Sequence, residues 1–99
     1  MPSFNINKKN DEHFFIEGDL TFFTLNKNTM KLFGFFKSGK KINIDLGGVN
    51  SADSAGLALI VELIKQSKLY GTQLVLKNIP QQLLTLANLS GLDIEKEIS

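Results

Sequence analysis

The stretch Ile42-Asn43-Ile44-Asp45-Leu46 and the stretch Asp53-Ser54-Ala55-Gly56 lie on either side of Gly47-Gly48, in the middle of the chain. In the first stretch apolar and polar residues alternate, which is typical of a strand. The second opens a long apolar run, residues 57–70, which Gly71 ends as expected for a helix. This order predicts an inner strand that turns at the two glycines and feeds a crossover helix.

Towards the N-terminus the sequence predicts two strands and a helix. Residues 4–6 alternate and residues 13–17 favour β-structure, so both form strands, joined by a turn at Asn10-Asp11. Apolar residues then recur with a helical period over residues 21–36, which predicts an amphipathic helix. Ser38-Gly39-Lys40 follows and ends that helix.

Towards the C-terminus the sequence predicts one more strand and one more helix. Residues 74–76 form the strand, Pro80 suits a first helical turn, and residues 81–90 form the helix before Gly91. The predicted order is β-β-α-β-α-β-α. We therefore expect an α/β fold in one domain over residues 1–99, with a small mixed sheet of about four strands and three helices packed on it.

Composition excludes several classes of function. The 99 residues include no cysteine and one histidine, His13, so no disulfide framework, thiol catalysis, metal site or cofactor is predicted. Acidic and basic residues are interspersed at a net charge of +1, so no basic face indicates nucleic acid or anionic lipid. No apolar run approaches the ~20 residues of a membrane span, and no signal peptide is recognised, so a cytoplasmic protein is expected.

The chemistry of the Asp53-Ser54 pair allows two interpretations. As the N-cap, Asp53 would accept hydrogen bonds from free backbone N–H groups, which stabilises a helix by about 1 kcal/mol. Ser54 would then lie in the first turn with its hydroxyl outward. A phosphate on Ser54 would gain from the helix dipole but would be repelled by the carboxylate of Asp53. Ordinary capping is the more common reason for such a pair, and contact or modification is the alternative.

The central helix carries apolar residues on two faces. The predicted core stripe consists of Leu57, Ile60, Val61 and Ile64. Leu59, Leu63 and Tyr70 project on a flank away from that stripe. They either contact a neighbouring protein or pack under the third helix, and the sequence leaves both possibilities open.

The longer string around this junction resembles the STAS family. In that family an Ile-Asp-Leu strand, here Ile44-Asp45-Leu46, runs into a helix start of the form Asp-Ser/Thr-x-Gly-Leu, here residues 53–57. Gly18-Asp19-Leu20 resembles the family's entry to its first helix. The match is closer to one branch, the small MlaB-like STAS subunits of bacterial Mla phospholipid ABC transporters, through residues 54–59 and 83–92.

The resemblance implies an open sheet with helices on one face and a non-enzymatic subunit. Such a subunit binds the transporter's cytoplasmic ATPase, is linked through it to a membrane permease, and supports assembly and activity at the inner membrane. In the family's anti-sigma factor antagonists, the residue that aligns with Ser54 is phosphorylated. Here Ala55 replaces the second serine of the antagonists' Asp-Ser-Ser-Gly motif, which argues against a kinase-driven switch.

The predicted partner-binding surface combines the helix start at Asp53-Ser54 with the flank of the central helix. Its residues are Asn50, Ser51, Asp53, Ser54, Ala55, Gly56, Leu59 and Leu63. Ser54 is also the candidate phosphorylation site, and no catalytic residue is predicted. The leading hypothesis is a subunit that binds a transporter ATPase, and the alternative is an anti-sigma factor antagonist regulated at Ser54. A small enzyme is the weakest hypothesis, since no catalytic constellation is recognisable.

Overall fold

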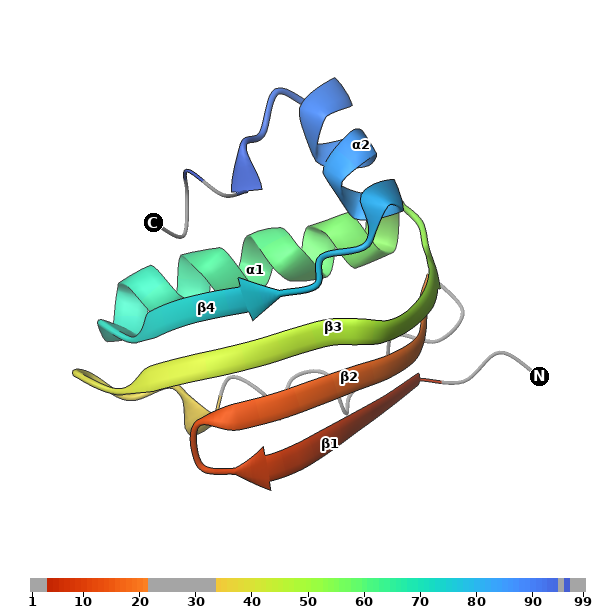
Figure 1. Ribbon diagram of the computed structural model, residues 1–99. Coiled ribbons are helices and arrows are strands. Elements are labelled where there is room, and N and C mark those ends of the chain that lie inside the picture. The colour runs from red at the N-terminus through yellow and green to blue at the C-terminus, as the bar shows by residue number, and fades with distance from the viewer. Residues whose placement is uncertain (1–3, 22–33, 95, 97–99) are drawn as a thin grey trace.

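The chain folds as a four-stranded sheet with helices packed against it, as the computed structural model in Figure 1 shows. The structure describes residues 4–21, 34–94 and 96. Its elements are β1 (Phe4–Asn10), β2 (His13–Leu20), β3 (Lys41–Ala52), α1 (Ser54–Tyr70), β4 (Gln73–Lys77) and α2 (Gln81–Leu89). Most of the helix predicted over residues 21–36 lies outside the described residues.

The sheet is mixed, as predicted. Its strand order is β1-β2-β3-β4, with β1 antiparallel to β2 and the other two pairs parallel. The turn between β1 and β2 lies at Asp11-Glu12, one residue later than predicted, because Asn10 still pairs with His13. The Asn10 side chain accepts a hydrogen bond from the backbone N–H of Glu12 (2.8 Å), which holds that turn. His13 is exposed at the start of β2.

β3 is longer than predicted, and Gly47-Gly48 does not form a turn. The strand continues through both glycines to Ala52. Its pairing with β2 shifts register here, so that Phe15 faces Asp45 while Glu17 faces Gly48. A Cβ atom on Gly48 would lie 2.6 Å from that of Glu17, so a glycine is needed at this irregularity. The two glycines therefore bend the strand and let it reach the start of α1.

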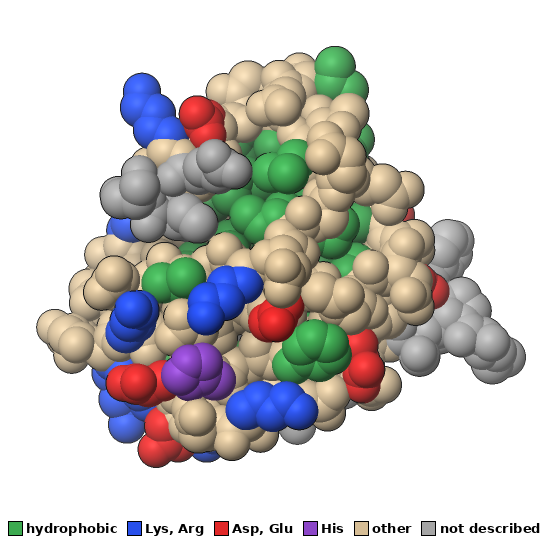
Figure 2. Space-filling model, in the orientation of Figure 1, with side chains coloured by type: hydrophobic (Ala, Val, Ile, Leu, Met, Phe, Trp, Pro, Cys, Tyr) green, Lys and Arg blue, Asp and Glu red, His purple; other side chains and the backbone are tan. Residues whose placement is uncertain are grey.

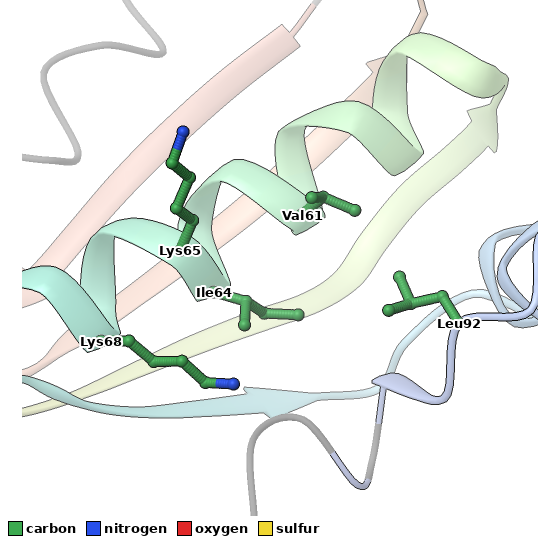
Figure 3. A pocket seen from close by; sticks show the side chains of 5 residues that line it. All are labelled: Val61, Ile64, Lys65, Lys68 and Leu92. Atoms are coloured by element: carbon green, nitrogen blue, oxygen red, sulfur yellow. The ribbon is translucent and has the colours of Figure 1, made fainter.

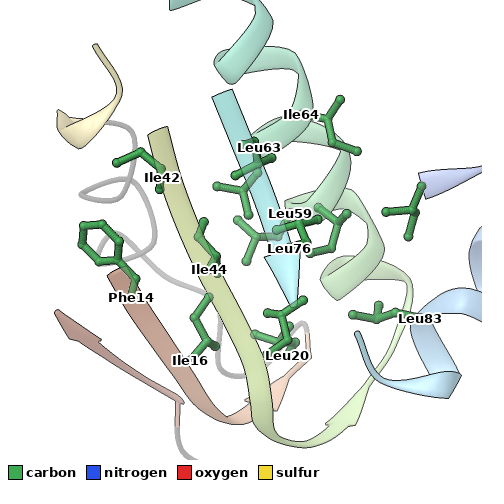
Figure 4. Close-up of a cluster of buried hydrophobic side chains, with 14 of the residues drawn as sticks. Phe14, Ile16, Leu20, Ile42, Ile44, Leu59, Leu63, Ile64, Leu76 and Leu83 are labelled. Carbon is green, nitrogen blue, oxygen red and sulfur yellow. The ribbon is translucent and has the colours of Figure 1, made fainter. Parts of the chain in front are cut away.

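The core lies between the sheet and α1 (Figure 4). From the sheet it takes Phe14, Ile16, Leu20, Ile42, Ile44, Leu46, Leu74 and Leu76. From α1 it takes Gly56, Leu59, Ile60, Leu63, Ile64 and Ser67. α2 closes one end with Leu83 and Ala87.

The buried face of α1 differs from the predicted stripe. Leu59 and Leu63 are only 8% and 0% exposed, whereas Val61 is 42% exposed. The prediction that Leu59 and Leu63 contact a partner is therefore wrong, and they pack inside the chain instead. The helix therefore turns a different face to the sheet from the predicted one, with Gly56 in its first turn close to the end of β2.

The C-terminal elements follow the prediction closely. Gly71 ends α1 in a left-handed conformation (φ 67°), and its N–H donates to the carbonyls of the last turn. α2 begins after Pro80 and ends one residue before the predicted end. In the described part of the chain, no helix combines the length and the apolar character that crossing a membrane requires.

Asp45 joins the bend in β3 to the loop after β4. Its Oδ1 atom accepts hydrogen bonds from the Asn78 side-chain amide (3.0 Å) and from the Gly47 backbone N–H (2.8 Å). The bond from Asn78, followed by that from Gly47, holds the pKa of Asp45 below its usual value of 3.8. Asp45 thus stabilises the fold in its charged form.

Replacing Asp45 with Ala is expected to lower the free energy of unfolding by about 1 kcal/mol at pH 7. Because the pKa is lowered in the folded state, this contribution is complete above the unfolded pKa and is lost as the pH falls through the folded one. Urea unfolding at pH 7 and at pH 3 measures it. Asn78→Gly, which keeps the left-handed backbone at this position (φ 55°), should reproduce part of the loss. An equal cost of Asp45→Ala at both pH values would contradict this role.

Candidate docking surface

Asp53 fixes the start of α1, as predicted. Its backbone is extended (φ −124°, ψ −165°), and its Oδ1 accepts a hydrogen bond from the Ala55 N–H (2.8 Å). Its own N–H donates to the Leu20 carbonyl (3.1 Å), and its carbonyl accepts from the Leu57 N–H (3.2 Å). Through these hydrogen bonds, Asp53 connects the first turn of α1 to the end of β2.

Gly56 is buried in the contact between α1 and β2. A Cβ atom at this position would lie 2.7 Å from the Leu20 carbonyl oxygen and 3.0 Å from the Leu20 Cβ. The glycine thus lets the helix approach the strand within the chain. Its predicted contact with a partner is corrected accordingly, since its neighbours are residues of this protein.

A groove of about 620 Å³ opens beside the start of α1. It is lined by Ala52, Asp53 and Ser54 from the junction, and by Gln81, Gln82, Thr85 and Leu86 from α2. We call it the docking groove. Ser54 is exposed in the first helical turn, as the sequence predicts.

Hydrogen bonds hold the walls of the docking groove in place. The Ala52 N–H donates to the Gln82 side-chain oxygen (3.0 Å), which links the junction to α2. On the other side, the Ser51 hydroxyl donates to the Asp19 carboxylate of β2 (2.8 Å). Within α2, the Gln81 amide donates to the Thr85 hydroxyl (3.3 Å). The groove is therefore preformed, which lowers the entropic cost of binding another molecule.

The predicted site residues divide into two groups. Asp53 and Ser54 line the docking groove, Asn50 is exposed beside it, and Ser51 and Ala55 are partly exposed. Gly56, Leu59 and Leu63 are buried. The wall that α2 contributes was not predicted, because the sequence pattern of an exposed helix face does not indicate which other element lies beside that face.

The lining of the docking groove favours binding to another molecule. It offers amide and hydroxyl groups together with the Leu86 side chain, and its charged residue is Asp53, which already caps the helix. Amide, hydroxyl and aliphatic groups are suited to recognising a protein surface through hydrogen bonds and apolar contact.

A second, smaller groove of about 270 Å³ lies further along α1 (Figure 3). Val61 and Ile64 form its apolar wall, and Leu92 faces them from the segment after α2. Lys65 and Lys68 lie along the same wall. Val61 therefore lines an open surface, which explains its exposure.

Comparison with known proteins agrees with this geometry. The model of the STAS domain family matches residues 5–98. The solved structure of the anti-sigma factor antagonist SpoIIAA in its unphosphorylated form has a similar fold, with a TM-score of 0.62 at 15% sequence identity. The similarity covers 86% of this chain and 81% of that chain. STAS domains are generally regulatory binding domains and not enzymes. From its sequence and its fold together, this chain belongs to the STAS domain family.

Proposed function

We propose that this STAS domain is a non-enzymatic subunit that binds the ATPase of an Mla-type phospholipid ABC transporter, which maintains outer-membrane lipid asymmetry, and supports its assembly and activity. The observation that carries the proposal is the preformed docking groove beside Ser54. Both segments that resemble the transporter branch, residues 54–59 and 83–92, lie on or continue from the two helices that line this groove. The resemblance and the geometry thus point to the same surface.

Binding at the docking groove follows from its shape and chemistry. A side chain or loop of the ATPase would enter between α1 and α2, next to the Ser54 hydroxyl and the Thr85 hydroxyl. Because Asp53 and Gln82 already fix the walls, little ordering is required on this side. Through the ATPase the subunit would reach the permease, which makes it peripheral to the inner membrane on the cytoplasmic side.

Replacing Ser54 with Arg is expected to reduce recovery of the ATPase at least about tenfold in tagged purification from membranes. The larger, charged side chain fills the groove and would be desolvated without a partner. Wild-type protein should bring down both an ATPase and a permease. Gln73→Arg is the matched control, since Gln73 is an exposed polar residue on β4 and does not line the docking groove. Equal recovery with Ser54→Arg would contradict the proposal.

A second candidate is an anti-sigma factor antagonist regulated by phosphorylation of Ser54. The fold similarity to SpoIIAA favours it, as does the exposure of Ser54 next to the capping carboxylate of Asp53. A phosphate at this position would add negative charge beside Asp53 and repel a bound partner. Ala55 remains the departure from the antagonists' motif.

Mass spectrometry after incubation with a cognate kinase and ATP separates the two candidates. The antagonist hypothesis predicts one phosphate per chain, located on Ser54 and absent from Ser54→Ala. The transporter hypothesis predicts an ATPase and a permease, and no kinase, in the purified complex. If Ser54 stays unmodified after incubation with each kinase that copurifies with the chain, the antagonist hypothesis is wrong.

A further inference from the structure

Several lysine residues that are far apart in the sequence lie near one another in the fold. Three hydrogen bonds join the segment before β3 to the segment after α1: Gly39 N–H to the Gly71 carbonyl (3.0 Å), the Thr72 hydroxyl to the Lys37 carbonyl (2.8 Å), and Gln73 N–H to the Lys40 carbonyl (2.8 Å). The lysines of the first segment therefore lie beside the end of α1.

The last turns of α1 add exposed basic and apolar side chains at the same place. Lys65 and Lys68 are exposed, and they are followed by Leu69 and Tyr70, which are 70% and 48% exposed. We call this end of the molecule the basic end and define it by the exposed or partly exposed residues Lys37, Lys40, Lys41, Lys65, Lys68, Leu69 and Tyr70. Figure 2 shows basic side chains, interspersed with acidic ones, toward the left of the molecule, where β3 starts and α1 ends in Figure 1.

The β1–β2 turn near this surface carries two exposed acidic residues, Asp11 and Glu12. Asp11 forms an ion pair with Lys8 (3.0 Å). Its pKa is lowered chiefly by Lys8, and further by the positive charges of Lys40 and Lys37. Lys37 and Lys40 thus lie near the β1–β2 turn, and among the described residues of this turn and the basic end the lysines outnumber the acidic residues Asp11 and Glu12.

We propose that the basic end binds the surface of an anionic lipid membrane. The lysines would contact headgroup phosphates, while Leu69 and Tyr70 would enter the interfacial layer, where aliphatic and aromatic side chains are stabilised. This exposed apolar pair favours a lipid surface over a nucleic acid, whose backbone offers no apolar layer. The contact is peripheral and involves no membrane span.

The basic end lies far enough from the docking groove for both to be occupied at once. They are at opposite ends of α1, whose 17 residues span about 25 Å. The membrane contact therefore goes beyond the proposed function and does not compete with it. It can be tested on the isolated chain, without an ATPase.

Flotation with vesicles tests the proposal. The chain should float with vesicles of phosphatidylglycerol and phosphatidylethanolamine at low salt, and should not float with pure phosphatidylcholine vesicles. The double variant Lys37→Glu/Lys41→Glu should weaken binding about tenfold. Leu69→Ser should weaken it several-fold, while Leu89→Ser, at an even more exposed leucine on α2, should leave it unchanged. Circular dichroism would check that each variant is folded.

Two results would overturn the proposal. One is equal flotation with anionic and zwitterionic vesicles, or with neither. The other is insensitivity to Leu69→Ser together with equally tight binding to double-stranded DNA, which would make the surface a general polyanion site. Neither result affects ATPase recovery through the docking groove, so the two proposals fail separately.

Discussion

Replacing Leu63 with Ala is expected to lower the free energy of unfolding by about 3 kcal/mol. Leu63 is fully buried between α1 and the sheet, so the change removes apolar contacts and leaves a cavity. Val61→Ala is the matched control on the same helix. Because Val61 is 42% exposed, it should cost about 0.5 kcal/mol or less. Urea unfolding at neutral pH measures both.

This pair of variants tests the rotation of α1 directly. The stripe predicted from the sequence contained Val61 and placed Leu63 outside it, whereas the structure reverses the two. A larger loss of stability for Val61→Ala than for Leu63→Ala would contradict the structure and restore the predicted stripe.

Replacing Gly56 with Val is expected to lower the free energy of unfolding by about 3 kcal/mol and to displace the start of α1. Even a single Cβ atom would lie 2.7 Å from the Leu20 carbonyl oxygen, which belongs to the backbone and cannot rotate away. Since Asp53 and Ser54 lie on this turn, the docking groove should be distorted as well. Thermal unfolding and ATPase recovery are the two measurements.

Gly34 provides the control for this substitution. Among the described residues, none lies within 4 Å of a Cβ atom built at Gly34, so Gly34→Ala should change stability by about 0.5 kcal/mol or less. If Gly56→Val were as well tolerated as Gly34→Ala, the close contact between α1 and β2 would not determine where the helix lies.

Local signals in the sequence predicted the capping of α1 correctly. Asp53 caps its start and Gly71 ends it in a left-handed conformation, because both effects depend on a few neighbouring residues. The rotation of the helix could not be predicted in the same way. Leu57, Leu59, Val61 and Leu63 are all aliphatic, so composition does not select the buried face, which depends on packing against the sheet, where Gly56 lies close to β2.

For a similar reason, only one wall of the docking groove could be predicted from the sequence. Asp53 and Ser54 stand out because a cap and a hydroxyl at a helix start are local features. The opposite wall comes from Gln81, Gln82 and Thr85, about thirty positions later in the chain, and they lie there only because β4 returns parallel to β3. Likewise, Gly47-Gly48 has the composition of a turn, but pairing with β2 keeps it in the strand.

Site-specific photo-crosslinking tests the central claim most directly. A photoreactive residue at position 54 or position 85, on the two walls of the docking groove, should crosslink to the ATPase in cells. The same residue at position 73, exposed on β4, should not. A crosslink from position 73 alone, with none from positions 54 and 85, would contradict the assignment of the docking groove as the ATPase-binding surface.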